Sequence, residues 1–227
     1  MSRFIKICEY ILFVLFFVLL FFMSNKLSIF MIIPLIVVIY FFIKKVKIKH
    51  FGIFIFLVAL IVRIIGVLVL KVDICDDFKT MYMASRDLIN GNLSFLKNSY
   101  FVYFSYQLGH VVYQALLLKI INSVMFLKII NCIITSFTVL FIYLITRKIF
   151  SENISRFVTF SYLFYLYPLY LNSVLTNQLL PALLVLIVIY LLVSKKLDYK
   201  LIFICSLILS FSYALLFSIF QSLMSPL

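Results

Sequence analysis

Acidic residues are scarce in this sequence of 227 residues. It has 7 Asp and Glu against 20 Lys and Arg, and only 12% of its residues are charged. Tryptophan is absent, and glycine, proline and cysteine occur 4 times each. With so few charged side chains, a globular domain of this size could not cover its apolar surface in water. The composition therefore excludes a water-soluble fold.

The cysteines are scattered and show neither a paired motif nor the spacing of metal ligands. They are Cys8, Cys75, Cys132 and Cys205. We interpret them as packing residues and predict no metal site from them. The net charge of +13 does not require a nucleic-acid partner, because the basic residues lie between apolar runs, where they orient helices in a membrane. We therefore expect no nucleic-acid partner.

Apolar residues are abundant: 67% of the sequence is hydrophobic, and its mean hydropathy is +1.27. Several runs approach or exceed the roughly 18 to 20 residues that span a bilayer. They are 7–23, 29–43, 51–70, 129–146, 157–171, 179–194 and 201–220. A transmembrane β-barrel would instead alternate apolar and polar positions. The sequence predicts an all-α fold, a polytopic transmembrane bundle of about seven spanning helices.

The segment 108–125 is ambiguous, because it could span the membrane or lie flat at its surface. Spanning would place Lys119 at bilayer depth and would turn the basic loops after residue 146 outward, against the positive-inside rule. If the segment lies flat, the inner segments hold 12 of the 20 basic residues. These segments are 1–9, 44–50, 147–156 and 195–200. We therefore predict an interfacial helix.

This topology places the chain in the plasma membrane with a cytoplasmic N-terminus and a long outer loop, 71–128. Residues 1–50 are expected to form a helical hairpin anchor. The first run is followed by polar residues without a small-residue cleavage pattern, so it is interpreted as a retained anchor. Residues 51–227 then form the rest of the bundle, with membrane lipids as neighbours.

The outer loop begins with an acidic stretch, KVDICDDFKTMYMASRDLINGN, which holds four of the seven acidic residues. Residues 77–90 are typical of a short amphipathic helix, with Asp76 or Asp77 as its N-terminal cap and Gly91 at its C-terminus. The carboxylates have two open interpretations. They are caps and solvated charges, or one of them deprotonates an acceptor hydroxyl at the membrane surface.

The stretches DDFKTMYMASRDLINGN and YFVYFSYQLGHVVYQALLLKIIN resemble the first outer loop of GT-C membrane glycosyltransferases. The likeness is to the bacterial branch related to protein mannosyltransferases and lipid A aminoarabinose transferases. The matching residues are Asp77, Phe78, Tyr82, Ala84, Leu88, Gly91, Tyr106, Gly109 and Tyr113. The resemblance implies that a sugar moves from a polyprenyl-phosphate donor to an acceptor on the outer face. It also implies that Asp77 is the catalytic base, with Asp76 as its alternate.

The sequence also departs from the family pattern. Many relatives carry a proline where this chain has FSYQLGH, and an acid in the second outer turn where it has Thr176, Asn177 and Gln178. A divalent metal is therefore possible but not required. Complete family members have more helices, so this chain is expected to be an N-terminal fragment or to need a partner chain.

Five further residues are candidates for substrate binding. They are Arg63, Tyr82, His110, Asn177 and Gln178. Arg63 lies inside an apolar run, where a charge is costly and often functional; it could pair with Asp73 or with a donor phosphate. For His110 and the second outer turn, simple roles as interfacial anchor and helix cap stay open. Two other functions also stay open: an O-antigen-type polysaccharide polymerase and a non-catalytic transport or assembly subunit.

Overall fold

The computed structural model describes residues 48–216, apart from the side chains of Leu166 and Leu216. The chain divides into two compact units, Met1–Lys47 and Ile48–Leu227, and the described residues belong to the second. The predicted spans 7–23 and 29–43, and with them nearly all of the 1–50 anchor, lie outside the described residues. Within the described part every regular element is a helix, which confirms the all-α prediction there.

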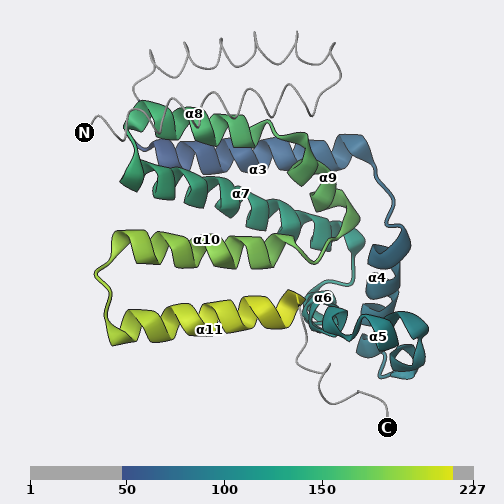
Figure 1. Cartoon of the computed structure of the whole chain (residues 1–227). Coiled ribbons are helices and arrows are strands. Elements are labelled where there is room, and N and C mark those ends of the chain that lie inside the picture. The colour runs from purple at the N-terminus through teal and green to yellow at the C-terminus, as the bar shows by residue number, and fades with distance from the viewer. Residues whose placement is uncertain (1–47, 217–227) are drawn as a thin grey trace. The chain divides into compact units, whose positions relative to one another are not determined.

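The body of this unit is formed by helices that lie side by side (Figure 1). They are α3 (Phe51–Leu70), α7 (Val124–Ile149), α8 (Glu152–Leu163), α10 (Leu179–Ser194) and α11 (Tyr199–Leu216). Other elements gather at one end of them. These are α4 (Asp76–Ile89), η1 (Ser94–Lys97), α5 (Ser99–Tyr103), η2 (Ser105–Gln107) and α6 (Leu108–Ile120). A short helix, α9 (Leu166–Val174), follows α8.

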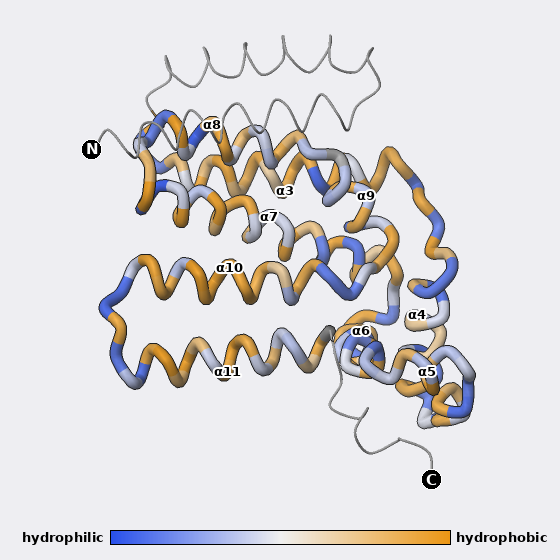
Figure 2. Tube along the Cα trace, viewed as in Figure 1, coloured by the Kyte–Doolittle hydropathy of each residue, from blue (hydrophilic) through white to orange (hydrophobic). Residues whose placement is uncertain are grey.

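Two helices are long and apolar enough to cross a membrane. They are α3, with 20 residues, and α7, with 26. At 1.5 Å per residue, α3 is about 30 Å long. Helices α10 and α11 are also apolar but shorter, and Figure 2 shows hydrophobic residues along both. The two long helices favour association with a membrane. Within residues 48–216 the structure supports two crossing helices, where the sequence predicts five of its about seven spans.

The apolar run 157–171 does not form one helix as expected. It is divided between α8 and α9. The chain leaves the helix at Phe164 and Tyr165, and Tyr165 has an extended backbone. Neither part is long enough to span a bilayer alone, because α8 has 12 residues and α9 has 9.

Helix α3 shows why these apolar helices pack as they do. Its buried residues recur every four positions: Phe51, Ile55, Ala59, Arg63 and Val67. This spacing puts them in one stripe along the helix, and the stripe packs against α7 and α9. The other side of α3 has apolar residues of which at least half the surface is exposed. They are Ile53, Leu57, Ile61 and Ile65. An exposed apolar face of this kind suits a lipid environment.

The segment 108–125 does not run along the long helices. Its helix, α6, has 13 residues, about 20 Å in length, and is too short to cross a bilayer. It packs on α4 and on the end of α11. The chain then leaves the helical conformation at Ile121 before α7 begins. This geometry agrees with the expectation that the segment does not span.

Candidate functional site

The acidic stretch folds as helix α4, close to the predicted 77–90. The cap was wrong: Cys75 is the N-cap, no side chain caps the helix, and Asp76 and Asp77 lie in its first turn. Carboxylates there interact favourably with the helix dipole. Gly91 has φ +75°, the left-handed conformation predicted for it at the C-terminus.

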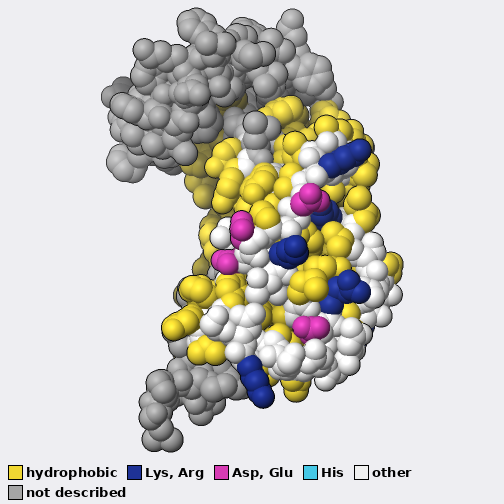
Figure 3. All heavy atoms as spheres, turned by 90° about the vertical axis from the view of Figure 1, so that its right-hand side faces the viewer, with side chains coloured by type: hydrophobic (Ala, Val, Ile, Leu, Met, Phe, Trp, Pro, Cys, Tyr) yellow, Lys and Arg dark blue, Asp and Glu magenta, His cyan; other side chains and the backbone are white. Residues whose placement is uncertain are grey.

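The position of α4 follows from the connection between it and α3. The backbone turns through a left-handed conformation at Lys71, with φ 41°. Lys128, at the start of α7, then donates a hydrogen bond from Nζ to the carbonyl oxygen of Val72 at 2.8 Å. These contacts hold Asp76 and Asp77, both exposed, at the end of the bundle. Figure 3 looks onto this end and shows acidic and basic side chains together on its surface.

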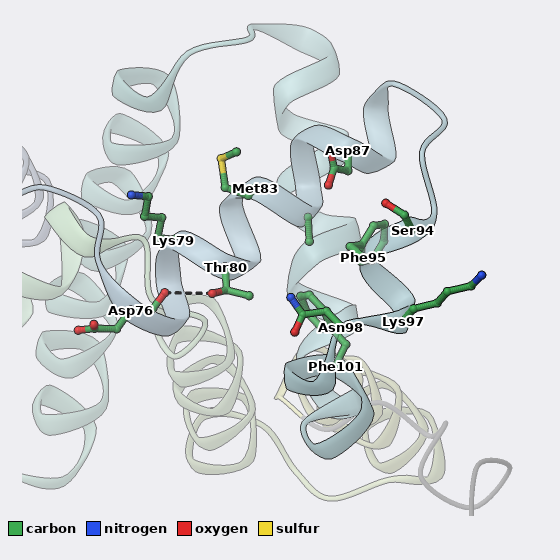
Figure 4. A pocket seen from close by; sticks show the side chains of 11 residues that line it. Asp76, Lys79, Thr80, Met83, Asp87, Ser94, Phe95, Lys97, Asn98 and Phe101 are labelled. Atoms are coloured by element: carbon green, nitrogen blue, oxygen red, sulfur yellow. Dashed lines mark hydrogen bonds between the residues drawn. The ribbon is translucent and has the colours of Figure 1, made fainter.

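An open hollow lies between α4 and the η1–α5 segment, with a cavity volume of about 700 Å³ (Figure 4). Phe95, Phe101 and Ala84 are among its apolar lining residues. Its polar lining residues are Asp76, Lys79, Thr80, Asp87, Ser94, Lys97 and Asn98. Residues with carboxylates and residues with amines therefore line the hollow, and the amine ends of Lys79 and Lys97 point outward on its two sides in Figure 4. A carboxylate can accept the proton of a hydroxyl, and an amine can bind a phosphate through its positive charge.

Asp77 itself does not line the hollow. It lies close enough to Tyr100 of α5 to interact with it electrostatically. Burial and the charge of Asp77 raise the pKa of Tyr100 to about 12. The Tyr100 hydroxyl is buried and has no hydrogen-bond partner among the described residues. Of the two predicted residues, Asp76 lines the hollow, although its carboxylate points away from the other lining side chains in Figure 4, and Asp77 lies near this tyrosine.

His110 belongs to a buried polar cluster that joins α4, α6 and the turn after α9. Its Nε2 lies 3.2 Å from the carbonyl oxygen of Leu175 and 2.9 Å from Nε2 of Gln114. The Ser85 hydroxyl lies 3.1 Å from Oε1 of Gln114. Burial lowers the pKa of His110 to about 4, although the bond to Leu175 acts in the opposite direction. The imidazole is therefore neutral at pH 7.

The turn that contains Thr176, Asn177 and Gln178 meets α6 at the same junction. Asn177 is buried and donates from Nδ2 to Oε1 of Gln107 at 2.6 Å. Thr176 accepts a hydrogen bond from the backbone N–H of Gln178 at 3.3 Å, while the Gln178 side chain is exposed. His110 and Asn177 thus connect elements, and neither lines the hollow.

The other two candidates lie elsewhere. Arg63 is fully buried in the bundle and donates from Nε to Oγ1 of Thr135 at 2.8 Å. The described residues give it no ion pair, so the pairing with Asp73, one of the alternatives left open, does not form. Asp73 interacts with Lys128 instead. Tyr82 packs with the apolar cluster around Leu118 and Leu175. The candidate residues therefore fall into separate groups.

Sequence reasoning missed several polar residues that these groups need. They are Ser85, Gln107, Thr135 and Asn172. Their position within otherwise apolar runs is the signal that could have identified them, because polar side chains need hydrogen-bond partners when they are buried. In the described part of the chain, no group of three or more His, Cys, Asp and Glu residues could hold a metal ion. Most of the buried polar side chains in this part of the chain are amides and hydroxyls.

Comparisons with known proteins add no relative: no family model, no curated protein and no solved structure matches this chain. The resemblance to GT-C glycosyltransferases rests on the residues of the loop 71–128. Its functional content is therefore a proposal, argued from the site itself.

Proposed function

We propose that this chain is a membrane glycosyltransferase that uses a polyprenyl-phosphate sugar donor. One observation carries the proposal. Asp76 and Asp77 begin a helix a few residues after the apolar helix α3, and Asp76 lines an open hollow with Lys79 and Lys97. A carboxylate and two amines at the end of an apolar helix suit a substrate whose lipid tail lies in the membrane and whose phosphate sugar lies at its surface.

The proposed reaction needs a base and a site for the leaving phosphate. The acceptor hydroxyl gives its proton to the Asp76 carboxylate, and its oxygen attacks the anomeric carbon of the sugar. The bond between that carbon and the phosphate oxygen breaks, and polyprenyl phosphate leaves with the electron pair. Lys79 and Lys97 supply positive charge for that phosphate. Asp77 is the alternate base, and its contact with Tyr100 gives it a different environment.

The proposed reaction takes place on the outer face of the membrane and therefore requires a particular topology. The described helices form part of a bundle of about seven spans in the plasma membrane, with the N-terminus in the cytoplasm and the loop 71–128 on the outer face. Helices α4 and α6 then lie along the outer surface. No step of the proposed reaction requires a metal.

Transfer of a labelled sugar from a polyprenyl-phosphate donor in membranes tests this function. We expect Asp76→Asn to lower the transfer rate by about 10²- to 10⁴-fold, the usual contribution of a general base, and Asp77→Asn to have a smaller effect. Asp198→Asn is the matched control, because in the described part of the chain the Asp198 carboxylate accepts a single hydrogen bond, from the backbone N–H of Leu201 near the start of α11. Wild-type rates in both Asp76→Asn and Asp77→Asn would refute the proposed base.

A second candidate function is a non-catalytic transport or assembly subunit. The buried polar chain from Arg63 through Thr135 to Asn172 favours it, because polar groups inside an apolar bundle often mark a substrate path. In that case the membranes transfer no sugar with the wild-type chain. The same assay therefore separates the two candidates.

A further inference from the structure

A cluster of hydrogen-bond donors lies inside the bundle, away from the hollow. Arg63 of α3, Thr135 of α7 and Asn172 of α9 are all nearly or fully buried. Arg63 donates from Nε to Oγ1 of Thr135 at 2.8 Å, and the Thr135 hydroxyl lies 3.1 Å from Oδ1 of Asn172. Thr135 therefore orients both side chains. We call Arg63, Thr135 and Asn172 the donor cluster.

The donor cluster has more hydrogen-bond donors than the described residues have acceptors for. Both terminal nitrogens of Arg63, Nη1 and Nη2, are buried without a hydrogen-bond partner in this part of the chain, and so is Nδ2 of Asn172. The hydroxyl of Ser173, the next residue, shares this property. Tyr162 interacts electrostatically with Arg63, but a neutral phenol does not compensate a charge.

Buried donors around a positive charge indicate the chemistry of a ligand. A buried guanidinium without an anion is costly, and buried polar groups almost always have partners. The free edge of a guanidinium carries two N–H₂ groups, which match two oxygens of one oxyanion in a bidentate arrangement. The amide N–H₂ of Asn172 adds further donors. A phosphate, with several non-bridging oxygens, accepts more of these hydrogen bonds than a carboxylate does.

The surroundings of the donor cluster indicate how the phosphate is carried. Arg63 lies seven residues before the end of α3, about 10 Å along the helix. Ile61 and Ile65, on the opposite face of α3, are exposed and apolar, and such a face suits a lipid environment. A phosphate bound among these helices therefore comes from the membrane, which suits a phosphate attached to a lipid chain.

We propose that Arg63 and Asn172 bind a phosphate oxyanion, carried by a lipid, inside the helical bundle. This site deepens the proposed function, whose donor is itself a lipid-linked phosphate. It requires only binding, so its test succeeds or fails independently of sugar transfer. It accounts for the placement of an arginine on the buried face of an apolar helix.

Thermal unfolding of the full chain in detergent tests the proposal, followed by helical circular dichroism because the chain lacks tryptophan. The added probes are dioleoylphosphatidic acid, dioleoylglycerol and inorganic phosphate. We expect the phosphatidic acid to raise the Tm of the wild type in a saturable way, since a ligand of the folded state stabilises it. Dioleoylglycerol, which has the same chains and no phosphate, leaves the Tm unchanged.

Three variants make the test specific. Arg63→Met removes the buried charge at similar length, so we expect it to melt at or above the wild-type temperature without lipid and to lose the lipid-induced rise. Asn172→Leu removes the amide and lowers the rise. Lys119→Met removes an exposed charge and keeps the wild-type rise, which excludes unspecific attraction to anionic lipid.

The probes also separate the sources of the phosphate. A rise with inorganic phosphate alone that Arg63→Met abolishes supports the oxyanion site and identifies free phosphate as its ligand. The proposal is overturned if neither phosphate-bearing probe raises the wild-type Tm. It is also overturned if Arg63→Met and Asn172→Leu both keep the full rise.

Discussion

At the scale of single residues, burial separates the polar side chains into two kinds. Asp76, Asp77 and Gln178 are exposed, whereas His110 and Asn177 are buried and hydrogen-bonded. An exposed carboxylate is free to meet a substrate. A buried, satisfied amide or imidazole holds elements together, and its loss costs stability because its partners are then left unpaired. The two kinds of residue therefore call for different measurements.

The stability of the chain should depend on pH through His110. Its pKa is lowered from an ordinary 6.5 to about 4 in the folded state. Between these values the unfolded chain binds a proton that the folded chain does not, so stability falls as the pH falls from 6.5 to 4. The loss approaches about 3 kcal/mol at the lower limit, and His110 contributes no pH dependence above 6.5.

Thermal unfolding of the wild type and of His110→Gln at pH values between 4 and 8 measures this dependence. The aspartates titrate in both proteins, so the difference between the two curves isolates the histidine. We expect the curves to converge as the pH falls. Parallel curves would show that His110 accepts a proton as readily in the folded state as in the unfolded state.

At the scale of helices, close approaches decide how the elements at the end of the bundle dock. Helix α6 packs on α4 through the Ser85 and Gln114 contact, and on α11 beside Gly109. At the opposite end, Glu152 of α8 forms ion pairs with Arg147 of α7 and with Arg156, the second at 2.7 Å. Arg156 also lies over the ring of Phe51, 4.7 Å from its centroid. Polar contacts therefore fix both ends of an otherwise apolar bundle.

Gly109→Ala should weaken the docking of α6 on α11. A methyl group at Gly109 would overlap the carbonyl oxygen of Ala214, which is backbone and cannot rotate away. We expect a loss of about 1–3 kcal/mol, typical of overpacking, seen as a lower Tm. Gly66→Ala is the control, because its methyl would meet only the tip of Leu169 at 3.3 Å, and alanine favours a helix. Equal melting of the two variants would contradict the α6–α11 contact.

At the scale of the whole described unit, charge is distributed along the bundle. Exposed basic residues occupy the end where α3 begins, α7 ends and α10 connects to α11. They are Lys49, Arg147, Lys148, Lys195, Lys196 and Lys200. Four of the acidic residues lie at the opposite end, in and before α4. The α4 end also carries five exposed basic residues, which are Lys71, Lys79, Arg86, Lys97 and Lys119. The described residues therefore favour an outward α4 end under the positive-inside rule by six exposed basic residues to five.

Cysteine labelling tests that orientation. In a variant whose native cysteines are replaced, we expect Lys119→Cys to react with a membrane-impermeant thiol reagent added to intact cells. Ser151→Cys should react only after the membrane is opened. Both positions are exposed in the structure, so accessibility to the reagent depends on the side of the membrane. Labelling of Ser151→Cys in intact cells would contradict the proposed topology.

Local pattern alone determined the helical class, the range of α3 and the position of α4 with Gly91 after it. Periodicity, apolar length and turn residues are encoded in neighbouring positions, which is why these features could be predicted. Only the tertiary structure decided which polar groups meet. Arg63 contacts a threonine 72 positions away, and Asn177 contacts a glutamine 70 positions away. It also placed Asp76, rather than Asp77, in the hollow. These outcomes depend on how packed helices are rotated against one another, and that rotation is set by the bundle as a whole rather than by any single segment.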